Sequence, residues 1–233
     1  MAVGFRAKTE SGIIQIDGTY QNLSLLAHSY ITTEAWATSP WLGTYMFSIN
    51  AANGTWPILA VRTAGKVTVV PASQTGNTYT WRIVTEGTGV QVEYWVFAKP
   101  ALIAASAYGM VIRNETTGEV VFDALHSWMR AAGAIDKAMG SPQNYSFPAG
   151  GVYAAVISQH SYYNYRQWLN MPELPAQVDI DLQLGMLSFS GTTIGYSEPR
   201  WQGIESQPGS PGEVNVLRAN QRFQALVLDV TGY

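Results

Sequence analysis

The chain has 233 residues, enough for one large domain or for two units of about 100 residues each. Hydrophobic residues make up 47% of the chain, but charged residues only 12%, against roughly 25% in an average globular protein. The net charge is −3 with no run of Lys or Arg, which argues against nucleic-acid binding. No apolar run approaches the ~20 residues that span a bilayer, so membrane insertion is not expected either. We expect a weakly charged surface that suits burial against partner subunits.

The chain contains no cysteine, which excludes disulfides, thiolate metal ligands and thiol catalysis. Its first ten residues, MAVGFRAKTE, lack the apolar segment of a signal peptide. Both features fit assembly in a reducing cytoplasm.

Residues 4–17 have a counterpart at mid-chain, residues 109–123. Each copy opens with Gly and an apolar residue, runs through a short strand to a turn glycine, and ends in a β-branched strand closed by Asp. Gly12 and Gly118 supply the positive φ that a chain reversal needs, so both copies are predicted to be β-hairpins. Their similarity favours an internal duplication; chance recurrence of a common β pattern is the alternative.

Segments rich in β-branched and aromatic residues follow the first hairpin at a spacing of about ten residues. They are residues 20–30, 43–50, 56–62, 65–71, 78–85 and 90–98. In the first of them, Leu23, Leu25 and Ala27 are expected on one face. Residues 31–41 are predicted to be a polar, aromatic loop, and Asn53-Gly54 a tight turn. Short strands at this spacing indicate an antiparallel sandwich or barrel.

Lys99-Pro100 separates the two predicted halves, residues 1–100 and 101–233, which form either two sandwich units or one joint domain. Residues 126–139 are the only helix candidate, weakened by Gly133; an extended loop with one helical turn is the alternative. Further strands are predicted at residues 151–159, 177–184, 186–190, 192–196 and 222–230, and an exposed loop at residues 198–212. The fold class expected is all-β, made of antiparallel sandwiches with at most one short helix.

Catalytic and metal-binding patterns give no positive signal. Asp179 and Asp181 share one face of a strand, which suits a calcium or acid-pair site but is equally typical of a half-exposed strand. There is no GxSxG, GxGxxG or phosphate loop. The histidines are far apart and have no metal-type partner at i+2 or i+4: His28, His126 and His160. We expect no enzyme activity, no cofactor and no metal; a polysaccharide-degrading enzyme using acids such as Glu173 is the weaker alternative.

Eight Trp and 13 Tyr are the remaining anomaly. Two clusters fall in loop-like segments: Trp36 with Trp41, and a run containing Tyr162, Tyr163, Tyr165, Arg166 and Trp168. Aromatic rings supply contact area at low entropic cost and their polar tips supply direction, as in subunit interfaces and carbohydrate-binding faces. We predict that these residues form an interface or a glycan-binding face; packing at the ends of the sandwich core is the alternative.

With its two hairpins the chain resembles a group of small virion proteins of tailed bacteriophages. The matching residues are Gly4-Phe5, Ser11-Gly12, Ile14–Asp17, Gly109-Met110, Thr117-Gly118 and Val120–Asp123. The rest of the chain is similar only in its composition and in the spacing of its predicted strands. The resemblance implies a structural component of the tail, baseplate or fibre region, assembled in the bacterial host cytoplasm and incorporated into the virion.

The chain has no heptads, collagen-like triplets or short-period repeat, which favours a compact adaptor or decoration unit over a fibre shaft. The expected partners are copies of the chain itself and other virion or tail proteins. In the alternative function, a receptor- or carbohydrate-binding adhesin, the partner is a host-surface glycan.

Overall fold

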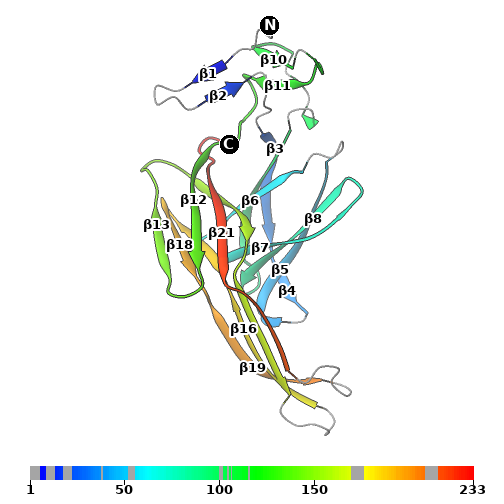
Figure 1. Ribbon diagram of the computed structural model, residues 1–233, viewed down its shortest axis with the longest axis vertical. Coiled ribbons are helices and arrows are strands. Elements are labelled where there is room, and N and C mark those ends of the chain that lie inside the picture. The colour runs from blue at the N-terminus through cyan, green and yellow to red at the C-terminus, as the bar shows by residue number, and fades with distance from the viewer. Residues whose placement is uncertain are drawn as a thin grey trace.

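The computed structural model describes residues 6–8, 14–17, 23–37, 39–51, 56–99, 102–103, 105, 107–114, 116–168, 176–207 and 215–233. Nearly all of these residues belong to antiparallel sheets, and no α-helix lies among them (Figure 1). The predicted fold class, an all-β protein of packed antiparallel sheets, is confirmed.

The body of the molecule is a sandwich of two large sheets. One consists of β3 (Ser24–Thr32), β6 (Ile58–Arg62), β9 (Gln91–Ala98), β12 (Ala131–Ala138), β14 (Tyr153–Gln159) and β21 (Arg222–Asp229), in the order β12-β21-β14-β6-β9-β3. The other consists of β4 (Glu34–Trp36), β5 (Ser39–Asn50), β7 (Val67–Thr75), β8 (Thr78–Glu86), β13 (Gln143–Ser146), β17 (Met186–Ser190) and β18 (Thr193–Ser197), in the order β13-β18-β17-β7-β8-β5-β4. Their facing sides share one hydrophobic core, to which both halves of the chain contribute.

Three smaller sheets extend from this body. Two are the hairpins, β1 (Arg6–Lys8) with β2 (Ile14–Asp17), and β10 (Val111–Arg113) with β11 (Val120–Asp123). The third, called the arm here, consists of β15 (Tyr162–Trp168), β16 (Ala176–Leu184), β19 (Arg200–Gln207) and β20 (Asn215–Asn220), in the order β19-β16-β15-β20. The hairpins and the arm lie at opposite ends of the molecule (Figure 1).

The two halves of the chain repeat one strand order. In the first half, β3, β9 and β6 are neighbours in one large sheet, and β5, β8 and β7 in the other. In the second half, β12, β21 and β14 take the same places in the first sheet, and β13, β18 and β17 in the second. The strands also follow one another along the chain in the same order. The arm and β4 are additions to this common plan, which agrees with the two related halves expected from the sequence.

Backbone hydrogen bonds repeat as well. Where β5 ends, the Ala51 N–H donates to the Asn77 carbonyl at 2.8 Å; where β13 ends, the Phe147 N–H donates to the Thr192 carbonyl at 3.0 Å. Each bond ties the residue after the outer strand to the turn of the neighbouring hairpin. The correspondence therefore extends from strand order to turn geometry.

The two small hairpins also correspond. In the first, Arg6 pairs with Asp17, and in the second Val111 pairs with Asp123. Both ladders shift register after their second pair, at equivalent positions. Gly118 has the predicted positive φ, 73°, whereas Gly12 lies outside the described residues.

Equivalent strands of the two halves meet antiparallel. Val61 of β6 pairs with Ala155 of β14, and Val67 of β7 pairs with Leu187 of β17. Strands from both sides of the predicted boundary at residue 100 thus belong to each large sheet. Antiparallel pairing of equivalent strands is the arrangement that a two-fold axis produces.

Most predicted strands are present with small shifts of their ends, but several segments differ. Residues 126–139 do not form a helix: residues 126–130 are irregular, and residues 131–138 are β12, which pairs with β21. Its Ile135 is buried, and a Cβ on Gly133 would lie 3.0 Å from Phe147 Cε1. The helix preference of a few alanines is small per residue, and tertiary packing overrides it.

Two predicted loops are also wrong in part. Residues 31–41 contain the end of β3 and all of β4, which pairs with the start of β5. Residues 198–212 contain β19, which pairs with β16 from Arg200 to Gln207; residues 208–212 and the predicted turn at Asn53-Gly54 lie outside the described residues. β4 is only three residues long, and β19 pairs with β16 across the intervening β17 and β18, so local alternation does not predict either strand.

The expected common face of Leu23, Leu25 and Ala27 is wrong as well. A register shift between Leu25 and Ala27 interrupts the alternation of β3. Leu23 and Leu25 pack on a smaller apolar cluster around Trp95, and Ala27 packs on the main core. A bulge turns later side chains to the other face.

Candidate functional site

The base of the arm carries an aromatic and apolar cluster. Its buried centre consists of Leu42, Val84, Leu184 and Met186, and four partly buried residues surround it: Trp36, Tyr162, Leu182 and Trp201. Trp36 and Tyr162 belong to the two aromatic groups singled out in the sequence. The structure brings these groups together, in keeping with the packing alternative, because the base of the arm packs against β4, β5 and β8.

Trp41 holds the arm at a second point. Its indole lies against Gly203 of β19, where a Cβ would come within 2.8 Å of Trp41 Cζ2. Near the same end of the sandwich, the Arg82 guanidinium lies 4.9 Å from the centre of the Trp36 ring. Trp36 and Trp41 therefore contact residues of the chain itself.

The run from Tyr162 to Trp168 is a strand, β15, and not the predicted loop. Neighbouring side chains of a strand point to opposite faces, so the run does not make one continuous aromatic face. Tyr162 packs in the cluster at the base of the arm, and Tyr163 and Tyr165 occupy the opposite face. Arg166 pairs with Ile180 and Trp168 pairs with Val178 along the backbone; their side chains lie outside the description.

The face that carries Tyr163 and Tyr165 also carries an ion pair. Tyr165 lies opposite Asp181, whose Oδ1 accepts a hydrogen bond of 2.8 Å from Arg200 Nε. This interaction holds the pKa of the Asp181 carboxyl below its usual value. Asp179 shares the face, as predicted, but Asp181 is neutralised by arginine, which argues against an acid pair. Glu173 lies outside the described residues.

Polar contacts tie together the points where the chain passes between sandwich and arm. The Tyr196 hydroxyl donates to Glu198, and it lies 2.8 Å from the Ser161 hydroxyl. Glu198 also accepts the Gly140 N–H at 2.9 Å. Burial, followed by the hydrogen bond with Glu198, raises the pKa of Tyr196 far above its usual value. A Cβ on Gly185 would collide with Ser161 Oγ, so the chain segments at residues 161 and 185 pack closely where they pass between the sandwich and the arm.

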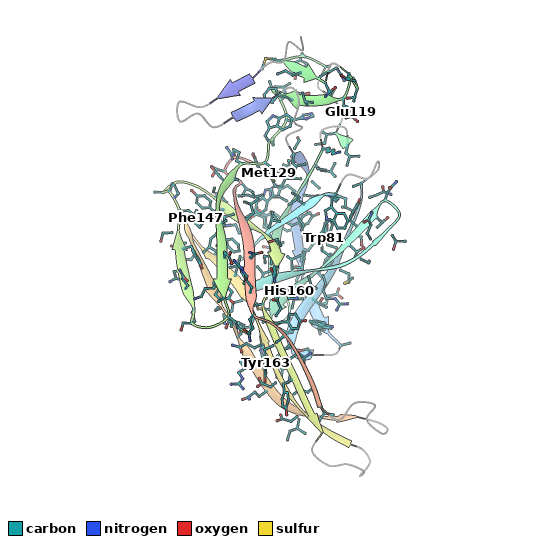
Figure 2. The ribbon with its side chains drawn as sticks, in the orientation of Figure 1. Trp81, Glu119, Met129, Phe147, His160 and Tyr163 are labelled. Carbon is teal, nitrogen blue, oxygen red and sulfur yellow. The ribbon has the colours of Figure 1, made fainter. Side chains whose placement is uncertain are left out.

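His160 lies at the same junction and Tyr163 lies on the arm beyond it (Figure 2). The His160 ring stacks on Tyr162 with their centres 5.5 Å apart, and burial lowers its pKa. The Asn220 amide donates to the His160 carbonyl at 2.7 Å. Side-chain contacts of Ser161, Tyr162, Glu198 and Asn220, residues at the base of the arm, therefore hold it to the sandwich.

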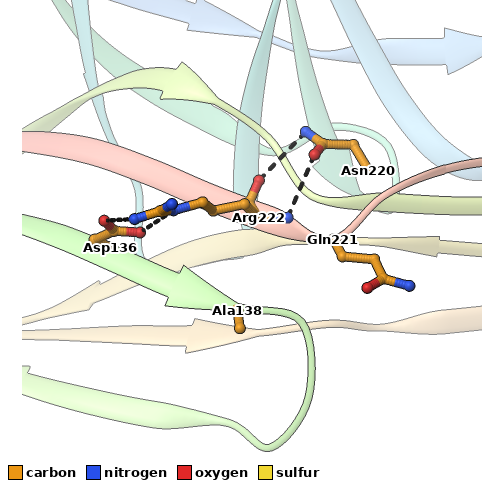
Figure 3. Close-up of a pocket in the computed structure, with 5 residues that line it drawn as sticks. All are labelled: Asp136, Ala138, Asn220, Gln221 and Arg222. Atoms are coloured by element: carbon orange, nitrogen blue, oxygen red, sulfur yellow. Dashed lines mark hydrogen bonds and ion pairs between the residues drawn. The ribbon is translucent and has the colours of Figure 1, made fainter.

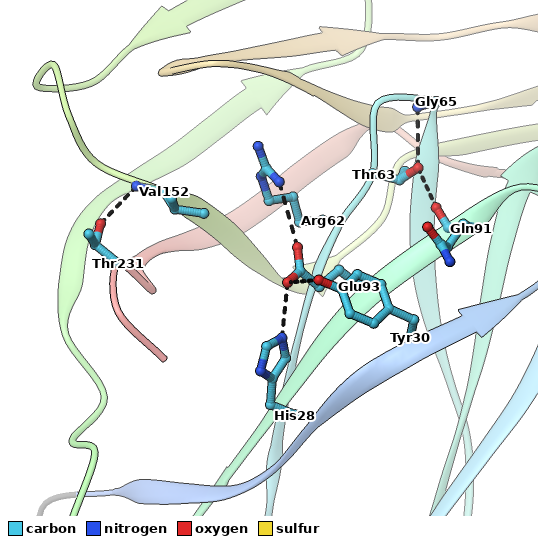
Figure 4. A network of polar contacts seen from close by, with 9 residues as sticks. All are labelled: His28, Tyr30, Arg62, Thr63, Gly65, Gln91, Glu93, Val152 and Thr231. Atoms are coloured by element: carbon cyan, nitrogen blue, oxygen red, sulfur yellow. Dashed lines mark hydrogen bonds and ion pairs between the residues drawn. The ribbon is translucent and has the colours of Figure 1, made fainter.

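A polar network on the six-stranded sheet was not predicted from the sequence. Glu93 accepts a hydrogen bond of 2.8 Å from the Tyr30 hydroxyl, lies 2.9 Å from His28 Nε2, and has Arg62 Nη1 at 3.6 Å (Figure 4). The hydrogen bond with Glu93 raises the pKa of Tyr30. His28 also stacks on Trp95 at 4.8 Å. These residues come from three strands far apart in the chain, and alternation on each strand was the only local signal.

An open depression of about 370 Å³ adjoins this network. A second one, of about 630 Å³, lies on the corresponding strands of the other half and is lined by Asp136, Ala138, Asn220, Gln221 and Arg222 (Figure 3). There Arg222 Nε donates to Asp136 Oδ1 at 2.7 Å, and this bond lowers the pKa of Asp136. Both depressions are open, and the charged groups at each are paired.

The three histidines occupy separate environments, since His28 belongs to the Glu93 network, His160 to the arm base, and His126 lies 3.5 Å from Asp123. In the part of the chain that the structure describes, no group of three or more His, Asp or Glu side chains could hold a metal ion. No helix in this part is long and apolar enough to cross a membrane.

Comparisons with protein-family models, with curated proteins and with solved structures gave no match.

We predict that Gly203→Ala destabilises the protein, because the new methyl group would displace the Trp41 indole. The expected loss is about 1–3 kcal/mol in the free energy of unfolding, measured by urea denaturation. Ser190→Ala, an exposed strand position on β17, is the control and should change stability by less than about 0.5 kcal/mol. In the Trp41→Ala background, Gly203→Ala should cost little; an undiminished loss there would contradict the contact.

The Asp181–Arg200 pair predicts a pH dependence. Because the pKa of Asp181 is lowered in the folded protein, its contribution is complete above its unfolded pKa of about 3.9 and is lost as the pH falls through the folded value. Arg200→Met should therefore lower stability at pH 7, and the difference from wild type should shrink below about pH 4. Urea denaturation across this range measures it. In an Asp181→Asn background the substitution should lose this pH dependence.

Proposed function

We propose that the chain is a non-enzymatic structural component of a tailed-bacteriophage virion, and that it works by assembling with copies of itself and with neighbouring tail proteins. The observation that carries the proposal is the arm. In the first half of the chain, residues 63–66 and 87–90 make short connections at the positions where the second half carries the arm. A sandwich half thus closes without such an insertion, so the arm points to a role beyond folding.

Exposed apolar side chains on the projecting parts support this function. Ile204 on the arm is 63% exposed, and Tyr108 and Leu125 beside the second hairpin are 77% and 55% exposed. Large exposed apolar groups on projecting elements are typical of surfaces that become buried in an assembly. The low content of charged residues agrees with this, because charged residues are depleted in interface cores.

The resemblance of the hairpins to tailed-phage virion proteins supplies the biological setting. In that setting the protein is made in the bacterial cytoplasm and becomes part of the tail, baseplate or fibre region. The two related halves present similar but unequal surfaces, which suits an adaptor between partners of different symmetry.

The assembly function predicts that the purified protein forms a defined oligomer or is incorporated into particles. Ile204→Asp should weaken this assembly, because it replaces an exposed apolar side chain of the arm by a charged one without disturbing the core. Thr75→Asp, an exposed position at the turn between β7 and β8, is the matched control. Light scattering behind a sizing column and incorporation into particles measure the effect. A monomer that never enters particles would refute the proposal.

A second candidate function is a carbohydrate-binding adhesin, favoured by one observation. Tyr163 and Tyr165 share a face of the arm with Gln183 and Arg200, as the strand registers require. Aromatic rings among planar polar side chains can stack on sugars and hydrogen-bond their hydroxyls.

In this case the double substitution Tyr163→Ala/Tyr165→Ala should abolish binding to host-surface polysaccharide while the fold survives, because it removes the stacking rings. Tyr30→Ala, an exposed tyrosine on another sheet, is the control. Binding isotherms and thermal unfolding separate the two effects, and unchanged binding in the double variant would eliminate this candidate.

A further inference from the structure

The four edge strands of the two large sheets differ in how well they are protected. Natural edges usually avoid pairing with other chains by being short, bulged or covered. β4 and β13 have three and four residues, and β3 contains a bulge and is bridged at its start by Trp128. β12 has eight residues, and its only register shift lies at its start, between Ala131 and Gly133. It is the least protected of the four edges.

The hydrogen-bond pattern between β12 and β21 shows which backbone groups of β12 point away from the sheet. The Met139 N–H donates to the Gln221 carbonyl at 2.7 Å, and bonded and non-bonded pairs alternate along an antiparallel ladder. Residues 133, 135 and 137 therefore bond to β21, and Ala134, Asp136 and Ala138 direct their N–H and C=O groups away from the sheet. Among the described residues, these outward groups have no backbone partner.

The side chains of β12 leave this edge accessible. Ala132, Ala134 and Ala138 are exposed and small, so they do not screen the backbone from an incoming strand. The Asp136 carboxylate is held by Arg222 and Gln224 of the neighbouring strand. A row of free backbone groups flanked by small side chains is the surface to which another strand adds.

We propose that β12 pairs antiparallel with β12 of a second copy, about a two-fold axis at Ile135, so that the two six-stranded sheets become continuous. The proposal rests on the assembly function above and names one of its surfaces. It extends the sheet in the way that β6 and β14 already join the two halves, by antiparallel pairing of equivalent strands.

The sequence of β12 suits pairing with itself in this register. Ala132 then faces the partner's Ala138, Gly133 the partner's Lys137, and Ala134 the partner's Asp136. Every such pair contains Ala or Gly, so neither like charges nor two bulky side chains meet. At the axis itself the two Ile135 backbones face each other, and each Ile135 side chain stays buried in the core of its own chain. A register centred on Asp136 would instead oppose two carboxylates, which is unfavourable.

The register can be tested by the sign of a charge at position 134. In full-length protein, Ala134→Glu would oppose the partner's Asp136 twice across the two-fold axis, and the dimer dissociation constant should rise roughly tenfold or more. Ala134→Lys, an equally exposed substitution, should keep or lower it. Ala134→Pro removes an outward N–H without breaking a bond to β21, so it should abolish pairing. Light scattering over a dilution series measures all three.

Hydrogen exchange provides a second measurement, in which the outward amides of β12 should be protected in the wild-type oligomer and exchange fast in Ala134→Pro. If the wild-type oligomer tolerates Glu, Lys and Pro at position 134 equally, this interface is wrong while the assembly function stands. A wild-type chain that stays monomeric at every concentration, or a β12 edge that is protected only by a different protein, also overturns the proposal.

Discussion

The shared hydrophobic core is the constraint on which the rest of this structure depends. Inside each large sheet one residue pair links strands of the two halves, Val61 with Ala155 and Val67 with Leu187, and only a few further backbone hydrogen bonds cross between the halves. Backbone hydrogen bonding across the junction is therefore minor, and burial of apolar side chains from both halves holds them together. Neither half has a separate main core, so the two sandwich units behave as one packed body.

This arrangement leaves the ends of the molecule free to carry additional elements. The arm consists of two insertions in the second half, β15 with β16 between β14 and β17, and β19 with β20 between β18 and β21. At the other end of the molecule, one small hairpin precedes each half of the chain. Buried Asp123 shows how a hairpin is attached: its carboxylate accepts the Leu125 N–H at 3.0 Å, and its carbonyl accepts the Trp128 indole N–H at 2.9 Å. The Asp that closes the repeated sequence motif thus fixes the hairpin to the strand that follows.

The main ion pairs of the molecule join neighbouring strands of the same sheet. Asp181 with Arg200, Asp136 with Arg222, and Glu93 with its three partners are each satisfied within one sheet. In a chain so poor in charge, backbone edges and aromatic groups are the main features left for recognition.

The sequence by itself determined the strand content, most strand positions and the repeated hairpin, because alternation and turn glycines are local signals. It could not assign β12, β15 and β19 as strands, because local composition indicated a helix or loops there, and only the pairing of β12 with distant β21, and of β15 and β19 with β16, makes them strands. It found Trp36, Trp41 and Tyr162 but neither the cluster that Trp36 and Tyr162 share nor the contact of Trp41 with Gly203, and it found neither the Glu93 network nor the open edge of β12. Only the tertiary structure decided these, because which strands become neighbours depends on the global burial of apolar surface.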